Sequence, residues 1–417
     1  MNSHSPPRGR HLLTRRPGRL SRLLATPFHR ILDRIDAGIE YGALEAMLPD
    51  GSFRILGGRG AGPHVAVTLG SWRALIRLGR SGSVGWYEAW AAGEWDSPDP
   101  VPLFDMFMRN RLTLGNTARA SGLSRLIKRA AHALRHNDAH GARRNIMAHY
   151  DLGNDFYACW LDTTMTYSSA MFASDGEPLE AAQARKMAAL NARLALAPAA
   201  NILEIGCGWG ALARDLASKG HDVTAITLSP SQRLHAETAA RGMANPPRFA
   251  LCDYRDIQGC YDAIVSVEMV EAVGQAYWPT YLDVIARSLK PGGRAAIQFI
   301  TIADDIFERY ADSADFIQTY IFPGGMLISQ SRLCALAQAR GLRWEAPQRF
   351  GLDYAATLTI WRERFDAAVE AGKLPSGFDA RFVRLWRYYL MYCEGGFRGG
   401  GIDVVQVTLV KADGAII

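Results

Sequence analysis

The chain has 417 residues, of which 48% are hydrophobic and 21% charged, and its formal net charge is +6. This length exceeds one small domain and the composition is globular, so we expect two folded domains rather than a fibrous or disordered chain. No apolar run approaches the roughly 18 residues that a membrane-spanning helix needs. The arginine-rich start lacks the apolar segment of a signal peptide, so we expect a cytoplasmic location.

Positive charge is concentrated in two segments of the sequence. Seven arginines and no acidic residue precede Asp33, and a second basic stretch runs from Arg119 to Arg144. Such segments attract polyanions, either nucleic acid or the anionic headgroups of a membrane. Because no nucleic-acid-binding signature occurs, we expect the anionic membrane surface as a partner and no nucleic acid. A solvated tail and an ordinary basic helix face would give the same pattern.

The first part of the chain predicts a tail and a small α+β domain. Residues 1–30 have the composition of a disordered basic tail. The pattern that follows predicts a turn at 48–51, a strand over 64–69, a helix over 72–78, a stretch rich in glycine and tryptophan over 82–100, and a helix over 103–111. We therefore expect an N-terminal domain over 31–115 and a basic linker over 116–145.

From residue 146 to 417, strands alternate with helices. Strands are predicted over 201–207, 222–228, 248–254, 261–267, 294–301, 342–350 and 403–411. Helices are predicted over 210–219, 231–241, 278–289, 355–371 and 379–393, with a turn at 290–293 and a mixed helical insert over 304–340. This alternation predicts an α/β fold with a mainly parallel sheet and right-handed crossovers. The six cysteines are scattered without metal-ligand spacing, so we expect free thiols and no metal.

The most informative motif is EIGCGWG (204–210), where a predicted strand ends and a helix begins. Its glycines let the backbone approach a ligand closely. A dinucleotide-binding fold, the alternative, prefers G-x-G-x-x-G with a pyrophosphate at the helix N-terminus. The spacing here favours S-adenosylmethionine (SAM), which carries no phosphate. Asp253, after the third strand, would then accept a hydrogen bond from the adenine amino group.

Several long segments resemble the cyclopropane-fatty-acyl-phospholipid synthases and mycolic acid methyltransferases. These segments are HYDLGNDFYACWLDTTMTYSSAMF (149–172), LEIGCGWGALA (203–213), ITLSPSQ (226–232), SVEMVEAVG (266–274), YIFPGGMLIS (320–329), FGLDYAATLTIWRERF (350–365) and RLWRYYLMYCEGGFR (384–398). SVGWYEAWAAGEWDSPD (83–99) resembles the full-length bacterial synthases, which carry a lipid-engaging domain. The resemblance implies a Rossmann-like class I methyltransferase sheet with helical inserts over 146–417, and a lipid-engaging domain over 31–115.

The resemblance also implies the site residues. The SAM site would comprise Tyr167, Ser168, Gly206, Gly208, Thr227, Gln232, Asp253 and Tyr254. Family members hold a bicarbonate ion that acts as the base. Its ligands would be the Ser169 backbone, the Glu271 carboxylate, the Ile302 backbone N–H and the Tyr354 hydroxyl. Cys393 stands at the family's nominal active-site cysteine. Structural roles stay open for Glu271, as a helix N-terminal acid, and for Tyr354 and Cys393, as packing residues.

The sequence departs from the family pattern near the base. Ser169 replaces the usual cysteine, and Ile300 and Ala272 stand where many members have histidine. Either fewer groups hold the bicarbonate, or another group is the base. Glu268 stands where many relatives have glycine, and we hypothesise that it removes the proton directly.

The expected chemistry follows from the weak nucleophilicity of an alkene. A dry pocket must align the double bond with the SAM methyl group, and the resulting carbocation can be stabilised by the aromatic faces of Tyr167, Tyr320, Tyr354 and Trp361. Loss of a proton from the new methyl group would close a cyclopropane ring. A different proton loss would give an exocyclic methylene, later reducible to a methyl branch.

We therefore expect a one-carbon transfer from SAM to the double bond of unsaturated acyl chains in membrane phospholipids, giving cyclopropane fatty acids at the inner face of the membrane. The first alternative is a fatty acid methyltransferase that gives a methylene- or methyl-branched chain without ring closure. A non-catalytic lipid-binding protein and a small-molecule methyltransferase are further alternatives. Double-bond position, headgroup preference and a homodimer are left open.

Overall fold

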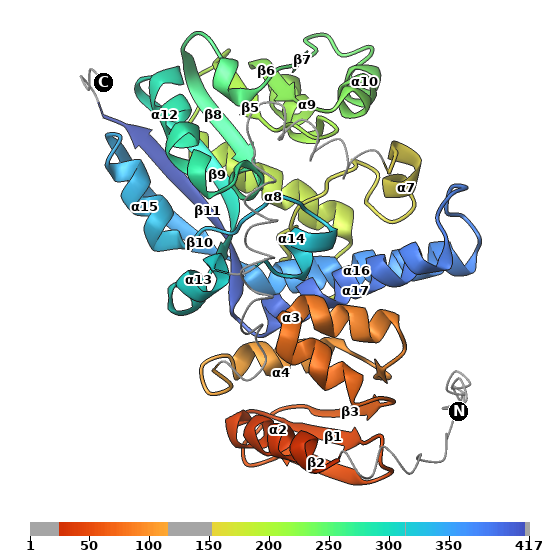
Figure 1. Cartoon of the computed structure of the whole chain (residues 1–417). Helices are drawn as coiled ribbons and strands as arrows, with labels where there is room; N and C mark the ends of the chain where they lie inside the picture. The colour runs from red at the N-terminus through yellow and green to blue at the C-terminus, as the bar shows by residue number, and fades with distance from the viewer. Residues whose placement is uncertain (1–24, 116–151, 313, 413–417) are drawn as a thin grey trace.

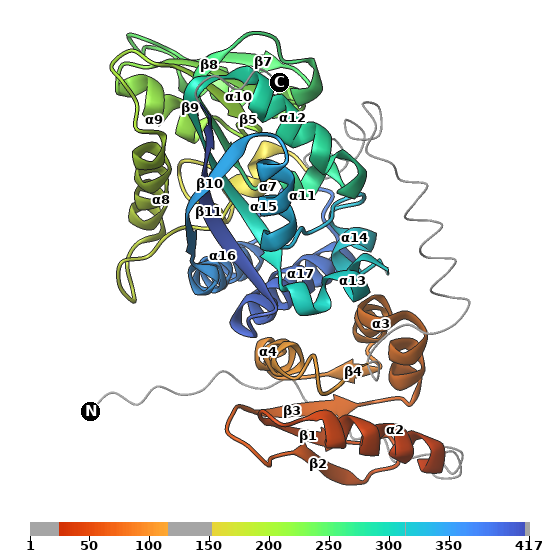
Figure 2. The same cartoon turned by 90° about the vertical axis from the view of Figure 1, so that its left-hand side faces the viewer.

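The computed structural model describes residues 25–115, 152–312 and 314–412. Two sheets organise this part of the chain, one of four strands and one of seven. Figure 1 and Figure 2 show the four-stranded sheet at the bottom, the seven-stranded sheet at the top, and a layer of helices between them. The expected pair of an N-terminal α+β domain and a larger α/β domain is thus confirmed.

The N-terminal domain contains three described helices and a mixed sheet. The helices are α2 (Ala25–Gly38), α3 (Arg73–Ala91) and α4 (Val101–Arg109), and the strands are β1 (Ala43–Met47), β2 (Phe53–Gly57), β3 (His64–Leu69) and β4 (Trp95–Asp96). The strand order is β2-β1-β3-β4, with β1 antiparallel to β2 and parallel to β3. Residues 25–30, predicted in the tail, belong to α2. The remaining tail, 1–24, and the predicted linker, 116–145, lie outside the described residues.

Helix α3 is longer than the sequence predicted. The predicted helix ended at Leu78, whereas α3 continues to Ala91 across a kink at Gly82, whose φ is 57° and ψ is −136°. The first part of the stretch rich in glycine and tryptophan, residues 82–91, therefore forms the second half of this helix, and Trp95–Asp96 form β4. Trp86 and Trp90, four residues apart on one face, are buried there, so core packing outweighs the low helix propensity of the glycines.

The larger sheet is mainly parallel, as predicted. Its strands are β5 (Asn201–Ile205), β6 (Asp222–Thr227), β7 (Arg248–Leu251), β8 (Tyr261–Val267), β9 (Leu289–Ile302), β10 (Leu342–Arg349) and β11 (Ile402–Lys411), in the order β10-β11-β9-β8-β5-β6-β7. Strands β7, β6, β5, β8 and β9 run parallel, while β11 is antiparallel to both β9 and β10. The turn predicted at 290–293 is instead an irregularity inside β9, where the register against β8 shifts after Tyr261.

Helices cover both faces of this sheet and fill the space below it. They are α7 (Asn154–Ala158), α8 (Leu179–Leu194), α9 (Ala211–Ser218), α10 (Pro230–Ala239), α11 (Val270–Val273), α12 (Trp278–Ser288), α13 (Asp304–Ala311), α14 (Phe316–Tyr320), α15 (Gln330–Gln338), α16 (Gly351–Glu370) and α17 (Ala380–Arg398). Short 3₁₀ turns occupy Tyr254–Asp256 and Gln275–Tyr277. Because helices cover both faces, inner strands such as β5 and β8 are largely buried and mostly apolar.

The two domains share one hydrophobic core. A Cβ atom at Gly395 would lie 2.4 Å from Cβ of Phe104, and one at Gly399 would lie 2.5 Å from Cβ of Met108. These glycines are four residues apart on one face of α17, so α4 can pack against the helix backbone. The same buried cluster includes Trp86 on α3. The N-terminal domain is therefore fixed against the helices that lie below the large sheet.

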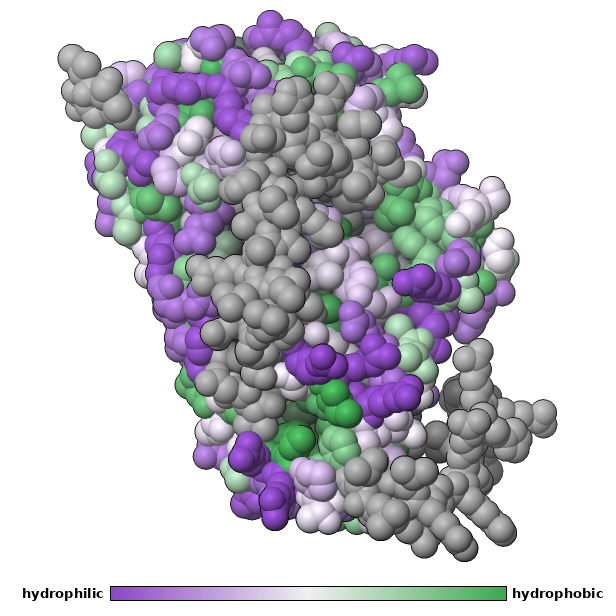
Figure 3. Space-filling view, in the orientation of Figure 1, coloured by the Kyte–Doolittle hydropathy of each residue, from purple (hydrophilic) through white to green (hydrophobic). Residues whose placement is uncertain are grey.

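No helix among the described residues has both the length and the apolar character needed to cross a membrane. The face in Figure 3 is mostly polar at the top, over the large sheet. Apolar residues gather lower down, over the N-terminal domain, and at the side beside α7.

Candidate active site

A cavity of about 850 Å³ extends from the carboxyl ends of the parallel strands to α3 and α4. Ligand pockets usually have volumes of about 300–1,000 Å³, so this one suits a large ligand or two ligands together. Its glycine-loop end is formed by Gly206, Gly208, Thr227 and Gln232. Apolar side chains such as Ile302, Leu358, Phe104 and Met108 line much of the remainder. One end of the cavity therefore suits a nucleoside, and the other end suits a hydrocarbon chain.

The glycine loop between β5 and α9 has the backbone that a close ligand requires. Gly206, Gly208 and Gly210 have φ values of 80°, 52° and 81°, which side chains rarely adopt. A Cβ at Gly208 would meet no heavy atom within 4 Å, and this residue lines the cavity. A Cβ at Gly210 would lie 2.8 Å from Cβ of Ala236. The second glycine thus leaves room for a ligand, while the third allows the loop to pack.

Most predicted SAM residues lie around this loop. Thr227 donates from its hydroxyl to Oε1 of Gln232 at 2.9 Å, and both residues line the cavity. Tyr254 also lines it, and within the described chain its buried hydroxyl has no hydrogen-bond partner. These residues fit a polar nucleoside.

Asp253 differs from the prediction. It is not among the lining residues, and its carboxylate accepts from Nε of Arg255 at 2.8 Å and from Nη2 at 2.6 Å. This ion pair lowers the pKa of the Asp253 carboxyl, although burial opposes the effect. The Asp253 carboxylate is therefore paired with Arg255, and its contact with an adenine amino group stays a prediction.

Tyr167 and Ser168 also line the cavity. The hydroxyls of Tyr167 and Tyr389 lie 2.8 Å apart and share a hydrogen bond. The Ser168 hydroxyl accepts from Nζ of Lys186 at 2.6 Å. The predicted pair thus faces the cavity, but each side chain is anchored by a residue on a helix.

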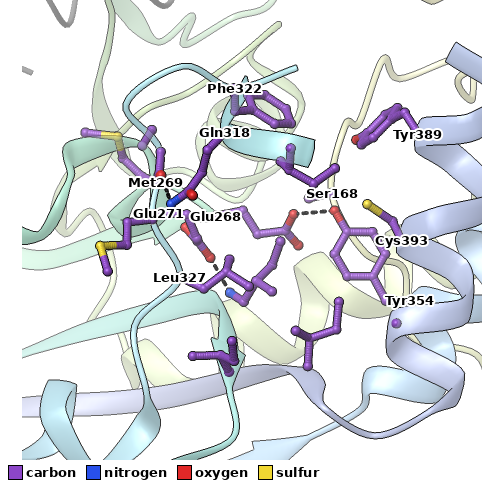
Figure 4. A pocket seen from close by; sticks show the side chains of 18 of the residues that line it. Ser168, Glu268, Met269, Glu271, Gln318, Phe322, Leu327, Tyr354, Tyr389 and Cys393 are labelled. Atoms are coloured by element: carbon purple, nitrogen blue, oxygen red, sulfur yellow. Dashed lines mark hydrogen bonds between the residues drawn. The ribbon is translucent and has the colours of Figure 1, made fainter. Parts of the chain in front are cut away.

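Glu268 lies at the centre of the cavity (Figure 4). Its Oε1 accepts from the backbone N–H of Ser169 at 2.9 Å and from Nε2 of Gln298 at 2.8 Å, and its Oε2 accepts from the Tyr354 hydroxyl at 2.7 Å. Glu268 has a φ of 49°, a conformation that strains a residue with a side chain. Burial raises the pKa of its carboxyl, and the three donors and the charge of Lys186 oppose that rise.

The four groups predicted to hold bicarbonate do not form an anion site. The Ser169 N–H and the Tyr354 hydroxyl both donate to Glu268, and the backbone N–H of Ile302 donates to the Ile328 carbonyl at 3.2 Å. A buried backbone donor takes the partner that a neighbouring segment offers, which the sequence pattern could not reveal for Ile302. The residues present do not fit a bound bicarbonate, because the Glu268 carboxylate occupies two of its predicted donors.

Glu271 is the remaining predicted ligand. Its Oε1 accepts from the backbone N–H of Ile300, the residue that stands in place of the expected histidine. Its Oε2 is buried and, within the described chain, has no hydrogen-bond partner. Burial, together with the negative charge of Glu268, raises the pKa of Glu271 to about 8. Glu271 is therefore protonated at neutral pH and can donate a proton or a hydrogen bond into the cavity.

This raised pKa predicts a pH dependence of stability. The folded chain holds a proton on Glu271 that the unfolded chain releases near pH 4.5, so stability should fall as pH rises from about 5 to about 8. Glu271→Gln should be more stable than the wild type at pH 8 by about 1–3 kcal/mol and equal to it near pH 5. The thermal midpoint of the ligand-free protein measures this. Glu370→Gln, on an exposed position of α16, is the control and should follow the wild type at both pH values.

The other predicted residues separate into two groups. Cys393 lines the cavity, and burial raises the pKa of its thiol, so it is not a thiolate nucleophile. Of the four aromatic residues proposed to stabilise a cation, Tyr167 and Tyr354 line the cavity. Tyr320 donates to Glu88 at 3.2 Å, and Trp361 packs edge-on against Trp160 in the core. Neither Tyr320 nor Trp361 is a lining residue.

Sequence reasoning missed Lys186 and Gln298. Lys186 lies on α8 and is 2% exposed, and it lines the cavity. A signal was present, since Lys186 shares a helix face with Leu179, Ala182 and Leu190, where an unpaired charge would be costly. Gln298 is a polar residue inside a buried strand, which gives a similar signal.

Comparison with known proteins decides the family. A family model described as mycolic acid cyclopropane synthetase matches residues 137–407. The chain belongs to this family. It is a SAM-dependent methyltransferase, and its seven-stranded sheet is the class I methyltransferase sheet.

Within the mycolic acid cyclopropane synthetase family, three similarities place the chain more closely. It is 40% identical over 356 residues to the tuberculostearic acid methyltransferase UfaA1 of Mycobacterium tuberculosis, covering 80% of each chain. It is 35% identical over 339 residues to the cyclopropane-fatty-acyl-phospholipid synthase of Escherichia coli, covering 80% of this chain and 85% of the relative. The mycolic acid cyclopropane synthase CmaA1, solved with SAH and CTAB, has 31% identity and a TM-score of 0.60, covering 64% of this chain and 98% of CmaA1.

Proposed function

We propose that this methyltransferase adds the methyl group of SAM to the double bond of unsaturated acyl chains in membrane phospholipids, and that the product is a methylene-branched chain without a ring. The observation that carries this proposal is the Glu268 carboxylate, which accepts hydrogen bonds from two of the donors predicted for a bicarbonate base, the Ser169 N–H and the Tyr354 hydroxyl. This product replaces the cyclopropane that the sequence first suggested.

The proposed reaction needs one base and no metal. SAM supplies an electrophilic methyl group. One alkene carbon takes that methyl as the C–S bond breaks, and the positive charge appears on the neighbouring carbon. A 1,2-hydride shift then moves the charge to the carbon that carries the methyl group. Glu268 then takes a proton from this same methyl group, and the electrons of the broken C–H bond form the exocyclic double bond. The hydride shift, and not the loss of a different proton as first expected, therefore separates this product from the ring.

The geometry of Glu268 supports this course. Oε1 already accepts two hydrogen bonds and Oε2 accepts one, so a single lone pair on Oε2, beside Tyr354, is left for the proton. A tethered base accepts a proton only from that direction, whereas a free ion can reorient toward the methyl group. Ring closure cannot occur until a methyl C–H bond points toward that lone pair of Glu268. The hydride shift needs no base and yields a more substituted cation, so it can occur first. The Tyr354 ring, stacked 4.4 Å from Phe397, is placed to stabilise the cation.

The comparisons support the same choice. UfaA1, at 40% identity, is named for the methyl-branched tuberculostearic acid, while the Escherichia coli relative at 35% is named for a cyclopropane product. A saturated methyl branch would need a hydride donor after the methylene forms. The proposed reaction therefore ends at the methylene.

Proton NMR of lipids tests the product. The chain would be expressed in a host that lacks cyclopropane lipids, and fatty acids would be extracted. We expect vinylidene protons downfield. Cyclopropane protons upfield would overturn the proposal in favour of ring closure, and an unchanged lipid would favour a small-molecule acceptor. Intact mass alone cannot decide, because a ring and a methylene both add one CH₂. Absence of SAM binding by calorimetry would instead support a non-catalytic lipid-binding protein.

We further propose that the N-terminal domain binds part of the lipid acyl chain. Its helices α3 and α4 contribute the side chains of Trp86, Phe104 and Met108 to the apolar lining of the cavity, where an acyl chain would lie. The contact with an anionic membrane surface at the inner face of the membrane and a homodimer stay predictions.

A further inference from the structure

Lys186 is a buried cation beside the reactive carboxylates. It lies on α8, is 2% exposed and lines the cavity, and its Nζ donates to the Ser168 hydroxyl at 2.6 Å. Burying an ammonium group is costly, and a purely structural position would favour an apolar side chain. The charge of Lys186 therefore calls for a role that a neutral residue cannot fill.

A short chain of contacts connects Lys186 to Glu268. Gln183, one turn earlier on α8, donates to the Ser168 carbonyl at 2.9 Å, so α8 holds both the backbone and the hydroxyl of Ser168. The next residue, Ser169, donates its backbone N–H to Oε1 of Glu268 at 2.9 Å. Movement of Lys186 or Gln183 would therefore change the position of a donor to the base.

Acidic groups predominate around Glu268. The titratable groups that interact with it or with its immediate partners are Lys186 on α8, Glu204 on β5, Glu271 on α11, Tyr354 on α16, Cys393 on α17, and Asp162 and Tyr167 between α7 and α8. The hydrogen bonds from Ser169, Tyr354 and Gln298 favour the ionised form of Glu268, and the positive charge of Lys186 adds to them. Burial acts in the opposite direction, as does any ionised fraction of Glu271.

We propose that Lys186 is a positioning residue for the reaction: its ammonium group holds Ser168 in place and keeps Glu268 ionised, so that it sets the lower pH limit of catalysis. This proposal rests on the proposed role of Glu268 as the base. In this proposal the charge of Lys186 acts on the ionisation of Glu268, whereas the hydrogen bond of Gln183 acts only on the position of Ser168.

The direction of the pH effect follows from the charge. A neutral residue at position 186 removes an attraction for the ionised form, so the pKa of Glu268 rises and the base is protonated over a wider acidic range. The acid limb of kcat/KM should then move to higher pH. An opposite charge within about 4–6 Å shifts the pKa of a carboxyl by about 1–3 units, and Lys186 contributes less to Glu268 than its three hydrogen bonds do, so the rate on the acid side should fall by up to about tenfold. The rate at alkaline pH should recover, because Glu268 ionises there.

The test is the pH profile of methyl transfer from SAM to vesicles of a phosphatidylglycerol with unsaturated chains, measured from about pH 5 to about pH 9. Lys186→Met removes both charge and hydrogen bond. Lys186→Gln keeps a donor for Ser168 without charge, and it serves if the methionine variant does not fold. Both variants should move the acid limb of the pH profile to higher pH. Gln183→Met, the matched control on the same helix, should lower the rate by one factor at every pH and leave the limb in place.

The outcomes separate the two proposals. If Lys186→Gln lowers the rate equally at all pH values, Lys186 has a structural role only and this inference is wrong. If Glu268→Gln keeps the full rate, or the product contains a ring, the proposed function fails instead. In a Glu268→Gln background, where the acid limb set by Glu268 is absent, the Lys186 variants should leave the shape of the residual pH profile unchanged. A change in that shape would show that the charge acts on another group.

Discussion

Replacing Glu268 by glutamine should lower kcat by about 10²–10⁴-fold, the usual contribution of a general base. The amide has nearly the same size and its oxygen can still accept from the Ser169 N–H, but it cannot take a proton from the methyl group. SAM affinity, measured by calorimetry, should change little because Glu268 is not part of the glycine loop. The rate would be measured as methyl transfer into extracted lipid. An unaltered rate would rule out Glu268 as the base.

Glu268→Gly gives a sharper form of the same experiment. Glycine tolerates the φ of 49° without strain, and its introduction would free the Ser169 N–H and the Tyr354 hydroxyl. Added bicarbonate or formate should then restore part of the rate in this variant and have no effect on the wild type. Rescue would show that the carboxylate replaces a small anion. Stimulation of the wild type by bicarbonate would contradict that conclusion.

The sequence predicted the large domain well because its signals are local and repeated. Strands β5 and β8 are mostly apolar segments separated by helices, and the glycine loop follows β5 directly. The second half of α3 was missed, because its glycines reduce helix propensity and only the packing of Trp86 and Trp90 compensates. Likewise, the turn predicted at 290–293 is absorbed into β9 as an irregularity, since β8 pairs with β9 on both sides of it, at Leu289 and from Arg294, and β11 pairs with β9 from Arg294 onward.

The structure brings some of the expected site residues to one cavity, and their contacts differ from those expected. Motif resemblance pointed to Glu271 and Tyr354, which line the cavity, and to Ser169, whose backbone N–H donates to Glu268. The hypothesis on Glu268 came from its departure from glycine. The hydrogen bond from Ile302 to Ile328 and the ion pair of Asp253 depend on which groups are nearest in space, and sequence alone does not carry that information.

Gly210→Ala should be the most damaging small substitution in the SAM site. A Cβ there would lie 2.8 Å from Cβ of Ala236 and 2.8 Å from Cε1 of Phe249, and the φ of 81° disfavours alanine. The left-handed strain costs about 1–2 kcal/mol and the overlap about 1–3 kcal/mol, so the free energy of unfolding should fall by about 2–5 kcal/mol. The loop must also move to relieve the overlap, so SAM affinity should fall. Thermal unfolding and calorimetry measure the two effects.

Gly220→Ala separates strain from overlap. Gly220 lies after α9 with a φ of 89°, and a Cβ there would meet no heavy atom within 4 Å. Its substitution should therefore cost only the strain, about 1–2 kcal/mol, and leave SAM affinity unchanged. If both variants lose the same stability and neither changes SAM affinity, then Ala236 and Phe249 give way without moving the loop. In that case the third glycine serves only the backbone conformation, and the tight packing of α10 and β7 against the loop does not help to bind SAM.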